Sequence, residues 1–588
     1  MSLGIWTRRH RDALAAGAIA WIACLGVVYA TPGDAYWIPD CGNKALVAQR
    51  LLDTGFSELN FTYPAAALDP LGLAFPIAEP FAVPRRGGFV SAYPPFYPAL
   101  AAPWLALLGE RGLRVPAALG VAASALCFAV WLAPVVGRRN AAAAGVVLAL
   151  ATPVFFYGIT VWEHSLTVAL CLAAFVALGR PSRGRRVLAG LLVASACAFR
   201  EELALLGLSL AVALFLHTRR LSDAADLALG ATPVLAAWAA FNWLAYDHPL
   251  GVHVAYALER PGGASLSGVG GFARNLFGLL AGFGANARES TLLGASALAA
   301  LAFGAVATRG DRAARAATWL ALATGLAVWC FGGFQIALAD RPYRELVYYN
   351  GVIVQLPLAA LAGVGAVRVW RDAEWAALRV GIGASLGFLA VAIVARSLTH
   401  FASGGHWSPR VLLPAVPALL ALAIAALRSQ AAGGGGRRTG AAVGCALLAA
   451  AGFASSGLAT WILAQQKGEA QRVQRAIASA PQAVVVTNHP ELTQQLASLW
   501  GHKPTLRVED SAGLARVSLA LHAAGVREFL FLAGPSGRDL GSVGGARCRL
   551  ETAHRGARFH FFDMDLQTCT VNAPPTGRPP PRSRRRRR

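Results

Sequence analysis

The chain has 588 residues, of which 56% are hydrophobic and only 14% are charged, and its formal net charge is +23. Soluble domains usually carry about 25% charged residues, so this composition excludes an ordinary soluble protein. Apolar segments of about 20 residues recur along the chain, and each is long enough to cross a bilayer core of about 30 Å. The sequence therefore predicts a polytopic helical membrane protein.

The basic residues alternate with the apolar segments, as they do in the inside loops of membrane proteins, which argues against nucleic-acid binding. With the N-terminus inside, every predicted inside loop is basic, and about 13 transmembrane helices put the C-terminal region outside. Twelve or fourteen transmembrane helices would instead put the C-terminal region inside. The predicted spans lie near 12–30, 113–135, 140–160, 164–179, 187–200, 202–217, 226–245, 291–308, 316–338, 346–367, 379–395, 411–427 and 440–463.

The longest polar stretch between predicted spans is the outer loop 31–112, which follows the first span directly. It contains the sequence DCGNK and closes on SAYPPFYPALAAPW. The proline-rich start of 94–109 predicts a juxtamembrane or re-entrant helix, and the alternative is a true second span. So much polar chain on one face predicts that the chemistry takes place there.

The pattern changes after residue 463. We expect a linker at 464–480, a small α/β domain at 481–570 and a disordered Pro/Arg-rich tail at 571–588. Within the α/β domain, PQAVVVTN, VREFLFLAG and ARFHFFDMDL read as strands. Cys548 and Cys569 could form a disulfide in an oxidising compartment.

Asp40, about ten residues beyond the first span, is the first candidate for catalysis. A carboxylate at the membrane surface could act as a general base toward an incoming hydroxyl or amine, and Asp34 could do the same. The alternative is that these residues cap a helix beginning near Asn43. Lys44 lies one helical turn after Asp40 and could pair with it or with a phosphate, although an ordinary surface ion pair is equally compatible with the pattern.

Two further charged clusters interrupt apolar sequence. Ionisable residues at membrane depth are costly and are functional candidates by default. In WEH at 162–164, Glu163 could orient a sugar hydroxyl or support the base, and His164 could bind a phosphate or shuttle a proton. In FREE at 199–202, Arg200 and Glu201 could shape a cavity floor. The alternatives are an interfacial helix cap and a buried structural ion pair.

Arg344, His406 and Arg410 lie in outer loops above apolar spans, where paired Arg donors suit a lipid phosphate. Loop solubility and cation–π contacts would explain them as well. The sequence has no Walker phosphate loop, no HExxH and no CxxC. We therefore expect no nucleotide cofactor and no required metal.

Taken together, DCGNK, SAYPPFYPALAAPWLALLG at 91–109, WEH, FREE and SPRVLLPAVP at 408–417 resemble the C-type superfamily of integral membrane glycosyltransferases. The resemblance covers residues 1–463. It implies an all-α polytopic membrane domain with a small C-terminal α/β extracytoplasmic domain. One departure from the family is that Asp34 and Asp40 do not form its usual acidic pair directly after the first span.

The resemblance also implies a function, namely sugar transfer from a polyprenyl-phosphate-linked donor to a lipid or glycan acceptor. The reaction would take place at the outer face of a bacterial cytoplasmic membrane and would invert the sugar. Asp40 would deprotonate the acceptor, and Arg410 and Arg200 would stabilise the leaving phosphate. Two alternatives stay open: a transporter or flippase of lipid-linked sugars, and a non-catalytic envelope assembly protein.

Overall fold

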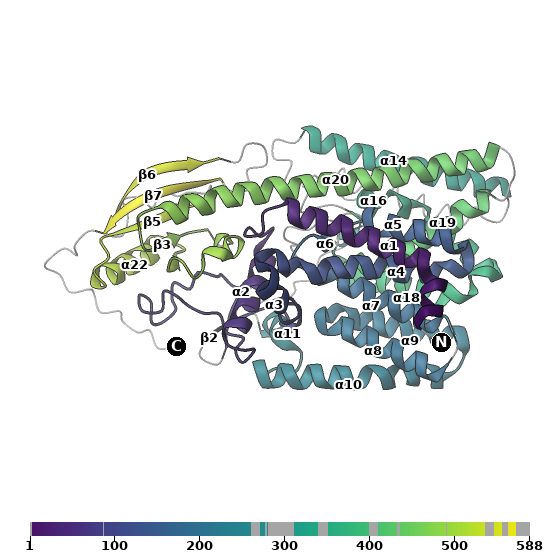
Figure 1. Cartoon of the computed structure of the whole chain (residues 1–588), viewed down its shortest axis with the longest axis horizontal. Coiled ribbons are helices and arrows are strands. Elements are labelled where there is room, and N and C mark those ends of the chain that lie inside the picture. The colour runs from purple at the N-terminus through teal and green to yellow at the C-terminus, as the bar shows by residue number, and fades with distance from the viewer. Residues whose placement is uncertain are drawn as a thin grey trace. The chain divides into compact units, whose positions relative to one another are not determined.

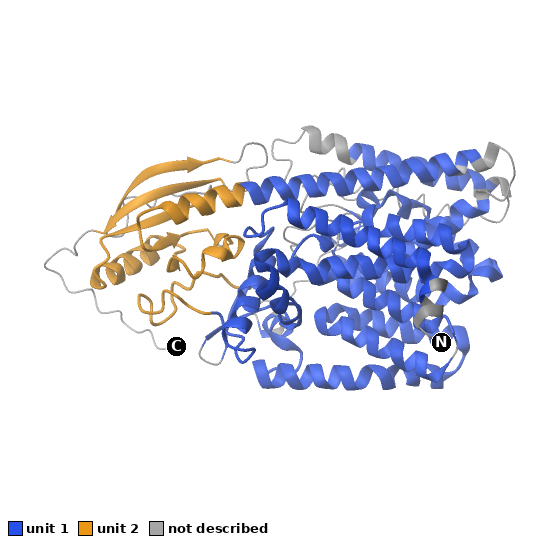
Figure 2. Ribbon diagram, viewed as in Figure 1, with its two compact units in different colours: residues 1–61, 80–468 blue, residues 62–79, 469–588 orange. Residues whose placement is uncertain are grey.

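The computed structural model of the chain is mainly helical and divides into two compact units (Figures 1 and 2). Unit 1 comprises 1–61 and 80–468, and unit 2 comprises 62–79 and 469–588. The described residues are 3–85, 88–180, 182–259, 271–273, 275–276, 279, 311–338, 351–398, 410–431, 436–489, 491–534, 546–555 and 563–571.

Unit 1 is built from helices and one hairpin. Its elements are α1 (Leu3–Ala30), α2 (Pro39–Asp53), β1 (Ala82–Arg85), β2 (Gly88–Ser91), α3 (Phe96–Leu108), η1 (Gly109–Arg114), α4 (Val115–Val136), α5 (Arg138–Leu150), α6 (Val154–Gly158), α7 (His164–Leu178), α8 (Arg183–Phe199), η2 (Glu201–Leu203), α9 (Ala204–Thr218), α10 (Leu221–Tyr246), α11 (Gly251–Glu259), α14 (Asp311–Leu338), α16 (Val352–Gln355), η4 (Pro357–Leu361), α17 (Ala362–Arg371), η5 (Ala373–Leu378), α18 (Arg379–Leu398), η6 (Arg410–Ala415), α19 (Val416–Ala431) and α20 (Gly436–Ser479).

Seven helical stretches among the described residues are long and apolar enough to cross a membrane. They are His10–Ala30, Phe96–Val136, Glu201–Thr218, Leu221–Tyr246, Ala373–Ser397, Arg410–Ser429 and Ala442–Ser479, and two shorter apolar helices are His164–Leu178 and Arg315–Phe331. The multi-pass architecture agrees with the prediction, whereas the count of thirteen spans is not confirmed.

Several predicted spans are interrupted. The span expected at 346–367 is divided over its described part, because Pro357 begins the 3-10 turn η4 between α16 and α17. The span expected at 140–160 ends with α5, and Pro153 precedes the short helix α6. The span expected at 291–308 lies outside the described residues.

Small residues let neighbouring helices approach closely in unit 1. A Cβ atom on Gly190 of α8 would lie 1.9 Å from the carbonyl oxygen of Leu227 in α10, and one on Gly230 would lie 1.8 Å from that of Val187. Only glycine fits at both positions, as at close contacts between membrane helices generally. The two helices therefore pack backbone against backbone.

The outer loop 31–112 is folded rather than irregular. It contains α2, the antiparallel hairpin of β1 and β2, and α3, which begins two residues after the predicted start of the juxtamembrane helix. In the hairpin, Val83 lies opposite Val90, and both side chains are buried. We expected the whole loop to belong to the membrane domain, but residues 62–79 belong to unit 2.

Unit 2 contains a five-stranded mixed sheet in the order β4-β3-β5-β7-β6, which confirms that an α/β fold follows the membrane helices. The strands are β3 (Val485–Thr487), β4 (Thr505–Arg507), β5 (Glu528–Ala533), β6 (Ala546–His554) and β7 (Met564–Val571). The helical elements are α21 (Leu492–Gln495), η7 (Ala497–Leu499) and α22 (Ser511–Ala523).

The boundaries of unit 2 differ from those expected for the α/β domain. Residues 464–479, which we expected to form a linker, are instead the last part of α20. This stretch is rich in Ala, Gln and Arg, which favour helices without the apolar pattern of a span. The segment 62–79 also joins the unit, since the backbone N–H of Arg507 donates to the carbonyl of Ala74 at 2.8 Å. The tail after Val571 lies outside the described residues.

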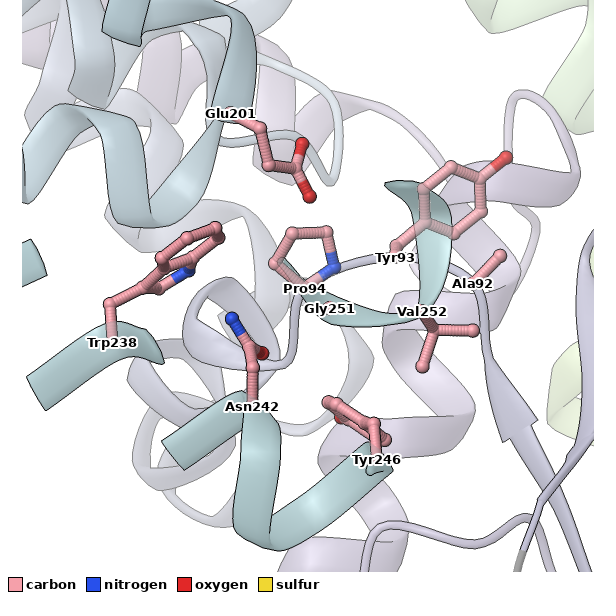
Figure 3. Close-up of a pocket in the computed structure, with 9 residues that line it drawn as sticks. All are labelled: Ala92, Tyr93, Pro94, Glu201, Trp238, Asn242, Tyr246, Gly251 and Val252. Carbon is pink, nitrogen blue, oxygen red and sulfur yellow. The ribbon is translucent and has the colours of Figure 1, made fainter. Parts of the chain in front are cut away.

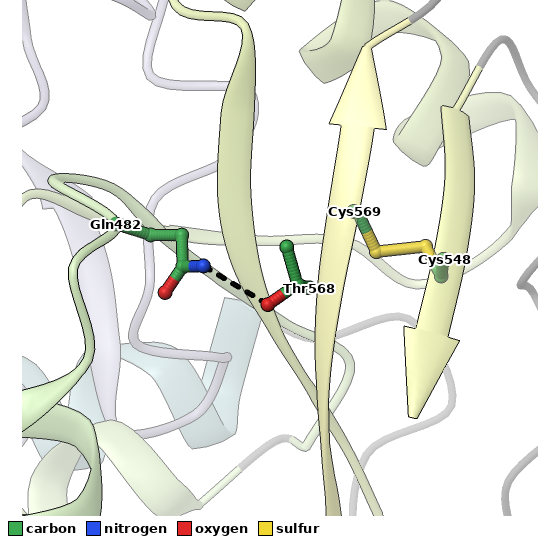
Figure 4. The surroundings of a disulfide bond; sticks show 4 residues. All are labelled: Gln482, Cys548, Thr568 and Cys569. Atoms are coloured by element: carbon green, nitrogen blue, oxygen red, sulfur yellow. Dashed lines mark hydrogen bonds between the residues drawn. A yellow bond between two sulfur atoms is a disulfide. The ribbon is translucent and has the colours of Figure 1, made fainter. Parts of the chain in front are cut away.

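The predicted disulfide joins Cys548 of β6 to Cys569 of β7 (Figure 4). The two cysteines lie directly opposite each other in the antiparallel ladder, with their Cα atoms 4.0 Å apart. Beside them in Figure 4, Gln482 donates to the Thr568 hydroxyl at 2.9 Å. The bond closes a segment of 21 residues in the strand pair at one edge of the sheet.

Replacing both cysteines by serine should lower the stability of unit 2 in the full-length protein by about 3 kcal/mol, because the unfolded segment regains its freedom. Pulse proteolysis in urea, followed by fragments from the C-terminal region, measures this change. Cys330→Ser is the matched control, since Cys330 is an exposed free thiol. Equal protection of wild type and double mutant would contradict a stabilising role.

Candidate active site

The segment that leads to Asp40 is held by side chains donating to its backbone carbonyls. Lys467 Nζ lies 3.0 Å from the carbonyl oxygen of Pro32 and also donates to that of Ala35. Arg114 donates to Thr31 Oγ1 and to the carbonyl of Pro32. Gln466 donates to the carbonyls of Tyr36 and Trp37. Buried carbonyls must find donors, so these side chains fix a segment that has no regular secondary structure.

Asp40 lies in the first turn of α2, which begins at Pro39. The N-cap position is Ile38, and no side chain caps the helix there, so Asp40 does not serve as its cap. A carboxylate in the first turn is favoured by the helix dipole. The Asp40 side chain is therefore available for contacts outside its own helix.

Both carboxylate oxygens of Asp40 accept hydrogen bonds. The Tyr93 hydroxyl donates to Oδ1 at 2.5 Å, and Arg410 Nη1 donates to Oδ2 at 2.7 Å. Asp40 is 4% exposed, and burial alone would raise the pKa of its carboxyl. The charges of Arg410 and Lys44 and the hydrogen bond from Tyr93 outweigh burial, so the pKa of Asp40 lies below its usual value.

The charges continue from Asp40 into a connected group. Lys44 Nζ lies 4.8 Å from the centre of the Tyr93 ring and 3.1 Å from Glu163 Oε2. Glu163 Oε1 lies 3.3 Å from Arg200 Nη1, and Arg200 Nε donates to Glu202 Oε1 at 2.8 Å. Lys44 is 2% exposed and Glu163 is 4% exposed, so this is a buried array of alternating charges. We call it the Asp40 cluster: Asp40, Lys44, Glu163, Arg200, Glu202 and Arg410.

The members of the Asp40 cluster come from helix ends that are distant in sequence. Glu163 immediately precedes α7, Arg200 joins α8 to η2, and Arg410 begins η6. At these positions the chain passes from one helix to the next, where charged side chains need not be placed along a lipid-facing surface. The structure thus brings together five predicted site residues: Asp40, Lys44, Glu163, Arg200 and Arg410.

His164 lies beside the Asp40 cluster, but its ring is packed among aromatic side chains. It is 2% exposed, and its ring centre lies 4.6 Å from that of Tyr157 and 5.4 Å from that of Trp162. The Arg410 guanidinium lies 5.6 Å from the centre of the Trp162 ring. The Trp162 ring thus contacts both His164 and Arg410, and the predicted role of His164 toward phosphate stays a prediction.

The other predicted residues fall in three places. Asp34 lies near Glu110 and Lys467, and Lys467 is one of the donors that hold the segment before Asp40. Glu201 lines a small pocket together with Tyr93 and Asn242 (Figure 3), and His253 Nδ1 lies 4.0 Å from its Oε2. Arg344 and His406 lie outside the described residues.

Some members of the site were not predicted. Tyr93 belongs to the SAYPPFYP run, and Glu202 belongs to FREE, but neither was selected individually. Lys467 and Gln466 lie in the stretch expected to be a linker, where their only signal was polar residues directly after an apolar helix. Within the described ranges, no group of three or more His, Cys, Asp or Glu side chains is placed to hold a metal ion.

Comparisons with known proteins found matches among solved structures, at low identity. No protein-family model and no curated protein sequence matches the chain. The structure of ArnT from Cupriavidus metallidurans bound to undecaprenyl phosphate matches 96% of this chain and 98% of that one, at 14% identity and a TM-score of 0.44. The archaeal oligosaccharyltransferase AglB from Archaeoglobus fulgidus, in complex with an inhibitory peptide and a dolichol-phosphate, matches 90% of this chain and 70% of that one, at 12% identity and a TM-score of 0.45.

These matched proteins are of the C-type superfamily that the sequence resembles. At such identities and TM-scores no residue's role is transferred from them to this chain. The site has to be interpreted from its own contacts.

Replacing Lys467 by Met should loosen the segment before Asp40, because the carbonyls of Pro32 and Ala35 lose a hydrogen-bond donor. We expect the free energy of local opening at residues 31–38 to fall by about 1–3 kcal/mol. Hydrogen–deuterium exchange of peptides covering this segment measures the change. The control is Lys503→Met, which removes similar bonds to the carbonyls of Ile477 and Ala480 in unit 2. Unchanged exchange at 31–38 would show that the segment is held by other contacts.

Proposed function

We propose that the protein is a membrane glycosyltransferase that moves a sugar from a polyprenyl-phosphate-linked donor to a lipid or glycan acceptor of the cell envelope. The observation that carries the proposal is the buried Asp40 carboxylate, which accepts hydrogen bonds from Tyr93 and Arg410. A carboxylate base beside a guanidinium supplies the two functions that this transfer needs, which are proton removal and stabilisation of a leaving phosphate.

The reaction would be a single displacement. The acceptor oxygen attacks the anomeric carbon of the sugar, the bond from that carbon to the phosphate oxygen breaks, and the lipid phosphate leaves with the electron pair. The acceptor proton passes to Asp40. One displacement inverts the anomeric centre.

Arg410 would change partners during this reaction. Its guanidinium pairs with Asp40 in the structure and has further N–H donors, which suit a phosphate. When the lipid phosphate draws Arg410 toward itself, Asp40 Oδ2 is left to accept the acceptor proton. The second cationic position is Arg200, whose side chain is 15% exposed and contacts both Glu163 and Glu202.

The location follows from the charge pattern of the sequence. Basic loops at 180–186, 217–220 and 309–315 would lie in the cytoplasm, as the positive-inside rule requires. The Asp40 cluster would then face the outer side of a bacterial cytoplasmic membrane, and unit 2 would be extracytoplasmic. The disulfide in unit 2 supports this assignment, because such bonds persist in oxidising compartments.

Asp40→Asn should reduce sugar transfer by about 10²–10⁴-fold while leaving the binding of undecaprenyl phosphate intact, because the amide cannot take a proton. The measurement is mass-spectrometric profiling of envelope glycans and polyprenyl-phosphate sugars in a deletion strain carrying each variant. Asp53→Asn is the control, since Asp53 is an exposed carboxylate at the end of the same helix.

The expected result is that one sugar disappears from the envelope and its lipid-linked donor accumulates, with rescue by wild type and Asp53→Asn only. Full rescue by Asp40→Asn would place the base elsewhere or make the protein a transporter or an assembly factor.

The pH dependence of transfer should report the charges around Asp40. Because the charges of Arg410 and Lys44 lower the pKa of Asp40, the acidic limb of kcat/KM should lie at lower pH than it would for an aspartate without these neighbours. Arg410→Gln removes a positive charge while burial remains, so the pKa of Asp40 should rise and the acidic limb of kcat/KM should move to higher pH. Arg428→Gln, in α19 and 43% exposed, is the control. A limb that stays in place would contradict coupling between Arg410 and Asp40.

A further inference from the structure

A basic patch lies where α8 and α10 begin. The segments 180–186 and 217–226, which lead into these helices, contain six arginines and only two acidic residues. The two helices pack against each other, and ion pairs join their first turns (Figure 1). We call the arginines of both segments the α8–α10 patch: Arg180, Arg183, Arg185, Arg186, Arg219 and Arg220.

The two acidic residues are already occupied by arginines of the patch. Arg186 Nε and Nη2 donate to Asp226 Oδ2 at 3.1 and 2.9 Å, and Arg186 Nη2 lies 3.2 Å from Asp223 Oδ1. Arg183 Nε lies 3.2 Å from Asp226 Oδ1. No ion pair with a described residue is formed by the other four arginines of the patch, which are Arg180, Arg185, Arg219 and Arg220. Their charges are not compensated within the described part of the chain.

The helix dipoles do not explain this accumulation of arginines. Cations are unfavourable at the N-terminus of a helix, which is the positive end of its dipole. Arg183, Arg185 and Arg186 lie in the first turn of α8, which has no acidic residue, and Arg220 immediately precedes α10. An anion supplied from outside the chain would relieve the concentration of positive charge.

Arg219 occupies a backbone position that favours glycine. It ends α9 in the left-handed conformation, with φ 58°. The Cβ atom of any other residue is crowded there, and helices commonly place glycine at such positions. The Arg219 side chain has no hydrogen bond to a described residue that would offset this cost. The arginine at this position therefore points to a contact of its side chain outside the chain.

Apolar surface begins directly beside the patch. Arg219 and Arg220 lie between Glu201–Thr218 and Leu221–Tyr246, two stretches that are long and apolar enough to cross a membrane. Leucines next to the arginines are exposed on all three helices: Leu188 and Leu191 of α8, Leu216 of α9, and Leu221 and Leu229 of α10. Phospholipid matches both surfaces, because its acyl chains suit the leucines and its phosphate oxygens suit the paired N–H donors of arginine.

We propose that the α8–α10 patch binds the phosphate groups of an anionic phospholipid in the cytoplasmic leaflet, with Arg185, Arg219 and Arg220 as donors. The excess of positive charge favours a lipid with two phosphates, such as cardiolipin, over a lipid with one. The adjoining leucines favour a lipid over a free phosphate. The inference is separate from the proposed function, since lipid binding at the patch does not involve the Asp40 cluster.

The test uses the purified full-length protein with Arg185→Gln, Arg219→Gln and Arg220→Gln combined, which we call the patch variant. Native mass spectrometry measures the binding of cardiolipin, phosphatidylglycerol and phosphatidylethanolamine, which carry two phosphates, one net negative charge and no net charge, respectively. Inorganic pyrophosphate serves as the soluble competitor.

The matched control separates a specific patch from a generally basic surface. It combines Arg138→Gln, Arg139→Gln and Arg371→Gln, which remove three exposed arginines from other predicted inside loops. The patch variant and the control variant have the same net charge, so a general electrostatic effect would change lipid binding equally in both.

We expect wild type and the control variant to bind cardiolipin most tightly and phosphatidylethanolamine least tightly. The patch variant should bind cardiolipin about 10–100-fold more weakly, since each arginine at an anionic membrane surface contributes about a factor of five. Added salt should weaken cardiolipin binding more in wild type than in the patch variant.

Arg219→Gly distinguishes lost binding from lost folding. Glycine suits the left-handed position, so the thermal stability of this variant in detergent should not fall. Its affinity for cardiolipin should fall about 5-fold, because one charge is lost. A cardiolipin affinity of Arg219→Gly equal to that of wild type would contradict the role of Arg219.

Equal cardiolipin affinities of the patch variant and the control variant would overturn the proposal. Equal affinities of wild type for the three lipids would also overturn it. Complete displacement of cardiolipin by an equal concentration of pyrophosphate would show a site for free phosphates and reject the lipid. Cardiolipin binding that depends on the patch, in a protein that transfers no sugar, would support this inference while rejecting the transferase function.

Discussion

The compensation of buried charge around Asp40 is the constraint on which the site depends. Each carboxylate of the Asp40 cluster contacts a cation, from Arg410 to Asp40 and from Lys44 and Arg200 to Glu163. An isolated ion of this kind would carry a desolvation penalty of several kcal/mol, and removing one partner of a buried pair costs about 3–5 kcal/mol. The ion pairs of the Asp40 cluster therefore hold together the helix ends that carry its side chains. Moving one member would disturb the contacts of the others.

The peptide segment before Asp40 also contains polar groups that need partners, namely its backbone carbonyls. Its carbonyls at Pro32 and Ala35 are buried and lack strand or helix partners, and Lys467 donates to both. The consequence is that the orientation of Asp40 depends on α20, a helix 427 positions later in the chain. Lys467 therefore positions the segment that carries Asp40, while Arg410 compensates the charge of Asp40.

The sequence allowed the charged part of the site to be predicted, because ionisable residues in apolar surroundings are conspicuous. Asp40, Glu163 and Arg410 were selected on that basis, although their pairing over 370 positions was not visible. Tyr93 and Lys467 could not be selected, since a tyrosine in an aromatic run and a lysine after an apolar helix have no signal until their partners are seen. The linker prediction at 464–480 failed for a related reason, because helix propensity without apolar periodicity does not distinguish a helix from a connection.

A base that is held ionised by its neighbours is also weakened by them, and the proposed function has to reconcile these two effects. Arg410 and Tyr93 occupy both oxygens of Asp40, which lowers its pKa and leaves no oxygen free of hydrogen bonds. If a lipid phosphate takes Arg410 away, burial raises the proton affinity of Asp40 at the moment when the donor is in place. Basicity would then appear only in the donor complex, which protects the base from water and from acceptors that arrive before the donor. The same guanidinium would thereby set the order of substrate binding.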